Sequence, residues 1–314
     1  MIIKPGTDRD NLMHNAYASD EALAVRQRTH DLYSSPKINF PEWVLNRIIW
    51  RGDEQVLDVG VGSGLYFEAL QSRIPNGHLV GADLSLGMVR SAAQQPLAAQ
   101  IELVNADVQS LPFPDHSFDV VLANHMLYHV PDINQALIEL RRVLKPEGIL
   151  IAATNARYNG NNDFNMGEFD NLIGRGCQGL GMRRSEIETL MERIHQSTGN
   201  FTIENGPSLL SHHFFAVQRS DLPGTLIFPE AQPAVDYVNS MRAMREPFLP
   251  DTIPWSALIT AIKSWLESRM TFSSYLAVPK LSGVLVATNG GGFAHEYVSR
   301  LHISETNSTN NDSH

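Results

Sequence analysis

Short apolar runs alternate with longer segments of helical periodicity in the first half of the chain. Segments such as 64–74 and 133–144 place apolar residues three and four positions apart, which is typical of helices with one buried face. The apolar runs between such segments predict strands at residues 56–59, 78–82, 101–104, 119–123 and 149–153. Regular alternation of strand and helix predicts a mostly parallel sheet that is covered by helices on both faces.

The pattern is less regular on either side of this region. Residues 11–33, and a segment that opens at Pro41, predict two N-terminal helices. After residue 153 the pattern predicts a helix at 184–198, strands at 214–218 and 225–228, helices near 231–245 and 255–269, and a closing strand at 284–288. Residues 305–314 are almost all polar and predict a disordered tail.

Composition narrows the class of protein. The chain has 314 residues, of which 43% are hydrophobic and 18% are charged, as in globular proteins with a real core. The formal charge of −10 argues against a nucleic-acid partner. The single cysteine excludes an internal disulfide, and we find neither a signal peptide nor a membrane span. We therefore expect a cytoplasmic location, whereas the oligomeric state is left open.

The chemistry is expected at the carboxyl ends of the strands, where open parallel sheets bind ligands. A turn of spacing G-x-G-x-G, residues 60–64, follows the first strand, and its glycines let a ligand lie against the backbone. A dinucleotide fingerprint needs G-x-G-x-x-G, and position 65 is Leu65. Asp83 and Asp107 follow the next two strands, although Asp83 alone fits a ribose contact, a helix cap or a nicotinamide-dependent enzyme equally well.

Five motifs in the correct order carry a more specific signal. They lie at residues 56–64, 81–88, 106–113, 117–119 and 142–148. Together they resemble the class I S-adenosylmethionine-dependent methyltransferases, and more closely the branch of the ubiquinone and menaquinone methyltransferases, over roughly residues 50–155. This resemblance implies a Rossmann-like, doubly wound α/β fold with an antiparallel last strand. It also implies S-adenosyl-L-methionine as cofactor and S-adenosyl-L-homocysteine as product.

The resemblance assigns roles by position. The glycines would pass against the methionine portion of the cofactor, Asp58 and Asn124 would meet its amine, and Asp83 would hold the ribose. Leu84 and Met88 would flank the adenine, Asp107 and Val108 would fix it, and Tyr17 would belong to a lid. The implied cofactor-binding residues are Tyr17, Asp58, Gly60, Gly62, Gly64, Asp83, Leu84, Met88, Asp107, Val108 and Asn124.

Two histidines just beyond the fourth strand, His125 and His129, are the candidate general bases or substrate contacts, and packing is the alternative role for both. We expect no metal site, because Met126 stands where the zinc-protease pattern needs a glutamate. Arg26 and Arg28 are expected to be solvated.

We therefore expect an N-terminal helical lid at 1–50, a cofactor-binding core at 51–155, and a substrate-side elaboration with the closing strands of the same domain, including a helical cap, at 156–304. The expected activity is methyl transfer to N, O or C of a small, apolar metabolite, as in small-molecule biosynthesis and secondary metabolism. A catalytically silent cofactor-binding partner protein and a nicotinamide-dependent oxidoreductase are the alternatives.

Overall fold

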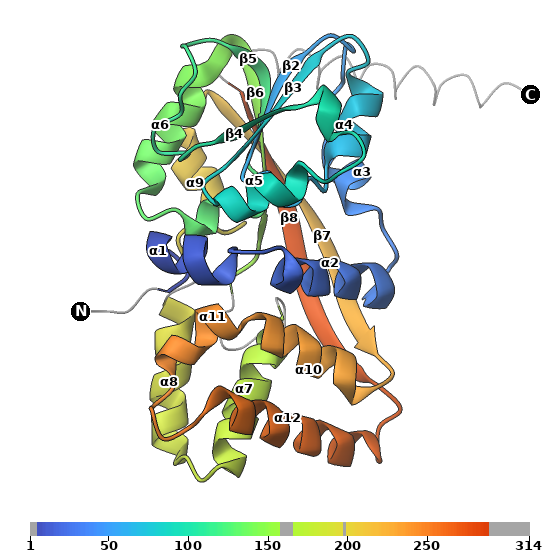
Figure 1. Ribbon diagram of the computed structural model, residues 1–314, viewed down its shortest axis with the longest axis vertical. Coiled ribbons are helices and arrows are strands. Elements are labelled where there is room, and N and C mark those ends of the chain that lie inside the picture. The colour runs from blue at the N-terminus through green and yellow to red at the C-terminus, as the bar shows by residue number, and fades with distance from the viewer. Residues whose placement is uncertain (1–4, 158–165, 197–198, 289–314) are drawn as a thin grey trace, which may run out of the picture.

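The computed structural model describes residues 5–157, 166–196 and 199–288. Within these residues one eight-stranded sheet has the order β1-β7-β8-β6-β5-β2-β3-β4 (Figure 1). Strands β2 to β6 pair in parallel, whereas β8 is antiparallel to both β6 and β7. The predicted Rossmann-like sheet with an antiparallel closing strand is confirmed.

Four of the five parallel strands lie within a residue or two of their predicted positions, whereas the last begins five residues before the predicted residue 149. The five strands are β2 (Gln55–Val59), β3 (His78–Asp83), β4 (Glu102–Asn105), β5 (Phe118–Leu122) and β6 (Leu144–Asn155). The intervening helices are α4 (Phe67–Arg73), α5 (Leu86–Ala92), η2 (Ala98–Gln100), η3 (Leu127–His129) and α6 (Ile133–Val143). The predicted caps are present, because Ser85 accepts a hydrogen bond from the amide of Met88 and Asp132 accepts one from the amide of Gln135.

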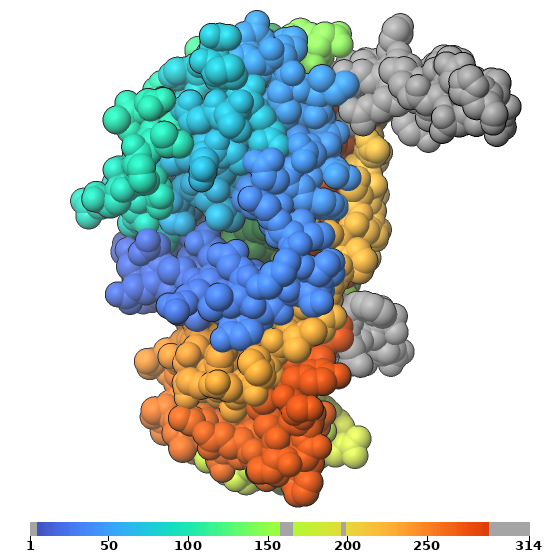
Figure 2. Space-filling model, turned by 90° about the vertical axis from the view of Figure 1, so that its right-hand side faces the viewer, coloured from blue at the N-terminus to red at the C-terminus, as the bar shows by residue number. Residues whose placement is uncertain are grey.

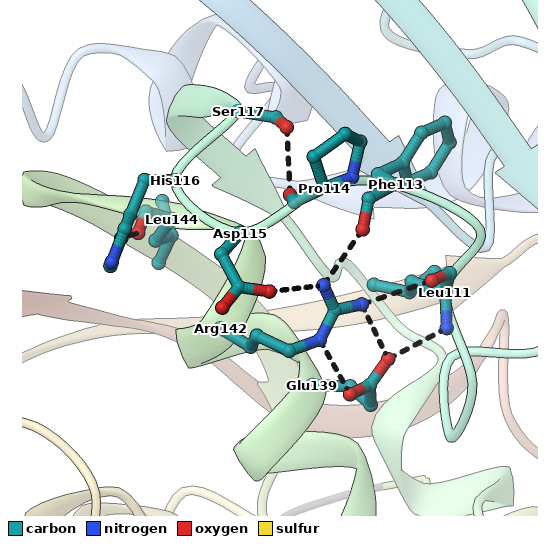
Figure 3. A network of polar contacts seen from close by, with 9 residues as sticks. All are labelled: Leu111, Phe113, Pro114, Asp115, His116, Ser117, Glu139, Arg142 and Leu144. Carbon is teal, nitrogen blue, oxygen red and sulfur yellow. Dashed lines mark hydrogen bonds and ion pairs between the residues drawn. The ribbon is translucent and has the colours of Figure 1, made fainter.

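Two of the family-like motifs stabilise this fold. Arg142 of α6 donates to the carbonyl oxygens of Phe113, at 2.7 Å, and Leu111, at 3.0 Å. Its guanidinium also pairs with Glu139 and Asp115, so α6 is tied to the loop that leads into β5 (Figure 3). The partly buried, multiply bonded Arg142 joins the motifs at 106–119 and 142–148, which gives both motifs a structural role.

The last two strands form a long ribbon, which corrects the sequence prediction. The predicted strands at 214–218 and 225–228 are a single strand, β7 (Ala216–Phe228), and the closing strand is β8 (Leu276–Thr288). They pair along their whole length, from Ala216 opposite Thr288 to Phe228 opposite Leu276. Pro223 and Gly224 indicate a turn, but a proline is tolerated here because β1 (Ser34–Ser35) pairs only with Thr225 and Leu226 on the other side of β7.

A group of helices surrounds the far end of this ribbon, in the lower half of Figure 1. These helices are α7 (Gly167–Gly179), α8 (Arg184–Gln196), α10 (Ala231–Ser240), α11 (Arg242–Arg245), η4 (Glu246–Phe248) and α12 (Trp255–Met270), and we call them the helical cap. The cap has its own buried cluster, and α7 approaches α12 so closely at Gly176 that an added Cβ would lie 2.6 Å from Leu258. The pattern did not predict α7, nor the short α9 (Gly206–Ser211) beside the sheet.

The N-terminal segment crosses between the sheet and the helical cap (Figure 1). It contains α1 (Arg9–Asn11), the π-helix η1 (Leu12–Ala16), α2 (Glu21–Tyr33) and α3 (Phe40–Leu45). The single helix predicted over 11–33 is therefore interrupted at residues 17–20. The side-chain amide of Asn11 donates to the carbonyl of Ala243 at 3.0 Å, which joins this segment to the cap. The predicted tail at 305–314 lies outside the described residues, and no helix within them is long and apolar enough to span a membrane.

Candidate active site

A cavity of about 1160 Å³ lies where the sheet, the N-terminal segment and the helical cap meet. Figure 2 shows a hollow at this level, between parts of the N-terminal segment. The cavity is lined by residues that follow β2, β3, β4 and β5, as expected for an open parallel sheet. Its volume exceeds the roughly 300–1,000 Å³ of ordinary ligand pockets, so it has room for a cofactor and a second molecule.

The glycine turn forms one wall of the cavity. Gly60 and Gly62 have φ angles of +72° and +57°, which favour glycine, and both line the cavity. The amides of Gly60 and Val61 both donate to the carbonyl of Ala82, which holds the turn against β3. Gly64 is not part of the lining, and a Cβ there would lie 2.7 Å from the Phe67 ring, so its freedom serves the turn.

Asp83 is held in a fixed orientation at the end of β3. Its Oδ2 accepts from the amide of Gly62 at 3.0 Å, and its Oδ1 accepts from the amide of Ser85 at 2.8 Å. Burial raises the pKa of Asp83, and these two hydrogen bonds oppose that effect. Each carboxylate oxygen keeps a free lone pair, which is what two adjacent ribose hydroxyls would need.

Asp58 and Asn124 bring unpartnered polar atoms into the same cavity. Asp58 pairs in register with Leu122, so Asn124 lies just beyond it on the neighbouring strand end. Asn124 Oδ1 accepts from the amide of Ala153, but Asn124 Nδ2 and Asp58 Oδ2 are buried without a partner among the described residues. Burial, and then the charge of Asp83, raise the pKa of Asp58 to about 8. The Asn124 amide needs an acceptor, and the Asp58 carboxylate, once ionised, needs a donor; the carboxylate and ammonium of an amino-acid head group supply both.

The predicted adenine-binding residues Leu84, Met88, Asp107 and Val108 also line the cavity. Asp107 is not free, because its Oδ2 lies 2.9 Å from Nη1 of Arg9 in α1. The carboxylate assigned to the adenine is therefore tied to the N-terminal segment.

His129 is fully engaged by the same segment. Its Nδ1 lies 2.7 Å from the carbonyl oxygen of Gly6, and its Nε2 lies 2.9 Å from the hydroxyl of Tyr17. Because a carbonyl only accepts, Nδ1 carries the proton and Nε2 accepts from Tyr17. Burial lowers the pKa of His129 to about 4, so the ring is neutral at pH 7. Tyr17 also lines the cavity, and its carbonyl accepts from Ser85 Oγ.

His125 also lines the cavity, but within the described residues its ring nitrogens are not hydrogen-bonded as those of His129 are. Its backbone has a φ of +54°, an unusual conformation for a residue with a side chain that is often found at functional sites. Burial, and then the charge of Lys280, lower the pKa of His125 to about 4. The ring packs against Phe40, and none of the hydrogen bonds among the described residues uses its nitrogens.

Comparison with known proteins shows which family the parallel strands and their helices resemble. Residues 57–152 match the family model described as a methyltransferase domain. A demethylmenaquinone methyltransferase from Listeria monocytogenes is 37% identical over 108 residues, which are 33% of this chain and 46% of that protein. Residues 57–152 are therefore similar to a methyltransferase domain. The chain spans about half the length of the curated relatives that it matches.

Solved structures share the fold of the whole methyltransferase domain with its flanking elements. A protein from Bacillus halodurans that is assigned as a methyltransferase has a TM-score of 0.52 at 18% identity, and the match covers 80% of this chain and 99% of that one. A phosphoethanolamine N-methyltransferase from Haemonchus contortus has a TM-score of 0.51 at 16% identity, with 89% and 59% covered. The family model and the relatives thus support a methyltransferase domain at residues 57–152, and the solved structures show the shared fold.

Sequence reasoning missed several residues that the methyltransferase domain and its neighbours bring into the cavity. The prediction that Arg26 is solvated is wrong, because Arg26 lines the cavity and its Nη2 is buried, whereas Arg28 is exposed as expected. His30 and Lys280 line it too. A charged residue on a helix usually indicates a face that meets solvent. Here the helical cap packs against α2 and covers that face. Among the described residues, no three His, Cys, Asp or Glu side chains gather as metal ligands.

Proposed function

We propose that this protein transfers the methyl group of S-adenosylmethionine to N, O or C of a small acceptor molecule. The observation that carries this proposal is the pair of buried, unpartnered atoms Asp58 Oδ2 and Asn124 Nδ2 inside the cavity. An amino-acid head group is the ligand that satisfies both, and the cofactor has one. The match of residues 57–152 to the methyltransferase family supports the same cofactor.

The chain's own residues bind and orient. Asp83 would hold the ribose, and Leu84 and Met88 would lie against the adenine, while Asp58 and Asn124 would hold the amino-acid end. The cofactor supplies an activated methyl group when bound. Tyr17 is held by His129 and Ser85, and there it would help the N-terminal segment to shield the bound cofactor from water. Positioning of this kind contributes much of the rate of a bimolecular displacement.

His125 is the better candidate for a general base. It lines the cavity as a neutral imidazole, which can accept a proton, and no described hydrogen bond uses its ring. His129 has both nitrogens engaged by Gly6 and Tyr17, so it serves the lid. His125→Ala should therefore lower kcat for a hydroxyl acceptor by about 100-fold or more at unchanged cofactor affinity.

Calorimetry with S-adenosylhomocysteine tests the cofactor assignment. We expect binding at micromolar ligand, and Asp83→Ala should weaken it about tenfold or more, because two hydrogen bonds to a charged group are lost. Asp53→Ala is the matched control, because the Asp53 side chain is 67% exposed and its one ion pair among the described residues is with Arg51 in the same loop. Absence of S-adenosylhomocysteine binding to the parent protein would overturn the proposal. An unchanged affinity in Asp83→Ala would overturn the assignment of Asp83 to the ribose.

A turnover assay separates the enzyme from its alternatives. Label from the methyl group of S-adenosylmethionine should appear in a component of a metabolite extract. Cofactor binding without transfer to any component would favour a catalytically silent partner protein. Retention of a nicotinamide cofactor on purification would favour an oxidoreductase.

A further inference from the structure

Two partly buried cationic side chains line the cavity, and neither forms an ion pair with a carboxylate among the described residues. Arg26 of α2 has a buried Nη2 with no hydrogen-bond partner among the described residues, and its guanidinium lies 5.5 Å from the centre of the Tyr17 ring. Lys280 of β8 donates to His30 Nδ1 at 2.9 Å and to Ser34 Oγ at 2.7 Å. Arg245 in the same cavity differs, because its Nε lies 2.8 Å from Oδ1 of Asp170.

The histidines beside these cations do not supply negative charge. An ammonium only donates, so His30 Nδ1 accepts from Lys280 and that ring is neutral. Burial, and then Lys280, lower the pKa of His30 to about 3, and His125 and Arg26 act in the same direction. The four side chains thus lie close together and carry a net positive charge, which is costly to bury without a counter-charge.

The surroundings of the cations define the rest of a ligand. Tyr237 stacks on Phe169 with ring centres 4.2 Å apart, and both rings line the cavity. The rings of His30 and Tyr237 lie in a T-shaped arrangement with their centres 6.0 Å apart, so this aromatic wall adjoins the cations. A ligand with an acidic group and a flat apolar body would satisfy both features.

We propose that the methyl acceptor is a small organic acid whose carboxylate or phosphate group lies between Arg26 and Lys280, with its apolar body against Tyr237 and Phe169. This inference rests on the proposed function, because it places the acceptor in the same cavity as the cofactor. It changes the expected substrate from an apolar metabolite to an amphipathic one. Arginine and lysine both bind either acidic group, so experiment distinguishes the two.

Fluorine NMR on protein saturated with S-adenosylhomocysteine tests the proposal. The probes are 4-fluorobenzoate with neutral 4-fluorobenzamide, and 4-fluorophenyl phosphate with neutral 4-fluorophenol. We expect at least one anion to bind and its neutral partner to bind about tenfold more weakly, because charge-assisted hydrogen bonds are lost. The anion that binds more tightly identifies the acidic group.

Variants connect the binding to the two cations. Arg26→Gln and Lys280→Gln should each weaken the anion about tenfold, whereas Lys280→Arg should retain most of the affinity. Arg28→Gln is the matched control, since Arg28 lies on the same helix but is exposed. If Arg26→Gln fails to fold, the two Lys280 variants carry the test.

The outcomes separate this inference from the proposed function. Equal affinity for an anion and its neutral partner would overturn the proposal of an anionic acceptor. Undiminished anion binding in both Arg26→Gln and Lys280→Gln would overturn it as well. Binding of S-adenosylhomocysteine with no binding of any anionic probe would do the same and leave the cofactor assignment intact. Failure of S-adenosylhomocysteine itself to bind would instead sink the proposed function.

Discussion

Replacement of Asp58 with asparagine should stabilise the cofactor-free protein and at the same time weaken cofactor binding. Asp58 is 2% exposed, and its Oδ2 has no partner among the described residues. Burial, and then Asp83, raise its pKa from 3.8 to about 8. Replacement of a residue that served only the fold would destabilise the protein. The sign of the change in unfolding free energy therefore distinguishes the two roles.

The magnitude follows from proton linkage. Between pH 3.8 and about 8 the folded state keeps a proton on Asp58 that the unfolded state has released. The unfolded state therefore binds fewer protons, and this group makes the free energy of unfolding fall as pH rises through that window. At pH 7 the difference spans about three pKa units, or about 4 kcal/mol at most. Asparagine does not ionise, so the variant escapes this loss.

Urea unfolding at pH 5, 6, 7 and 8 is the assay, with calorimetry of S-adenosylhomocysteine in parallel. The stability of Asp58→Asn relative to the parent should increase with pH, and its affinity for the ligand should fall about tenfold or more, because the ligand's ammonium loses a charged partner. Asp53→Asn, on an exposed side chain, is the control for both measurements. A variant that is less stable at pH 7, with the same pH dependence as the parent, would refute this account of Asp58.

Three further predictions concern the same cavity. Gly60→Ala should destabilise the protein by about 1–3 kcal/mol in urea unfolding, because φ at this position is +72°. Gly179→Ala is the control and should show little loss, because an added Cβ there meets nothing within 4 Å. Arg9→Gln breaks the 2.9 Å ion pair with Asp107 and should speed proteolytic cleavage of the N-terminal segment, with an unchanged cleavage rate contradicting the lid. The affinity for S-adenosylhomocysteine should rise as pH approaches about 8, since Asp58 must lose its proton to receive an ammonium, and Asp58→Asn should flatten that slope.

The parallel strands, and the position at the strand ends of the residues proposed to hold the cofactor, were predictable from the sequence. Fully apolar strands, the caps Ser85 and Asp132, and polar residues directly after strands are local features, and the sheet brings the strand ends together whatever surrounds them. Most of the predicted cofactor-binding residues that line the cavity lie within a few positions of a strand end. The exceptions are Met88 in α5 and Tyr17 in the N-terminal segment.

Only the tertiary structure decided which side chains form the proposed acceptor site. Whether Arg26 meets solvent depends on what packs against α2, and Lys280 enters the cavity because β7 and β8 continue past the sheet as one ribbon, although Pro223 and Gly224 indicate a turn. The role of His129 likewise depends on Gly6 and Tyr17, which lie more than 100 positions away in the chain. The sequence by itself determined the strand ends that would hold the methyl donor. Long-range packing decided which charges are buried beside them, because burial is a property of neighbours that the local pattern does not contain.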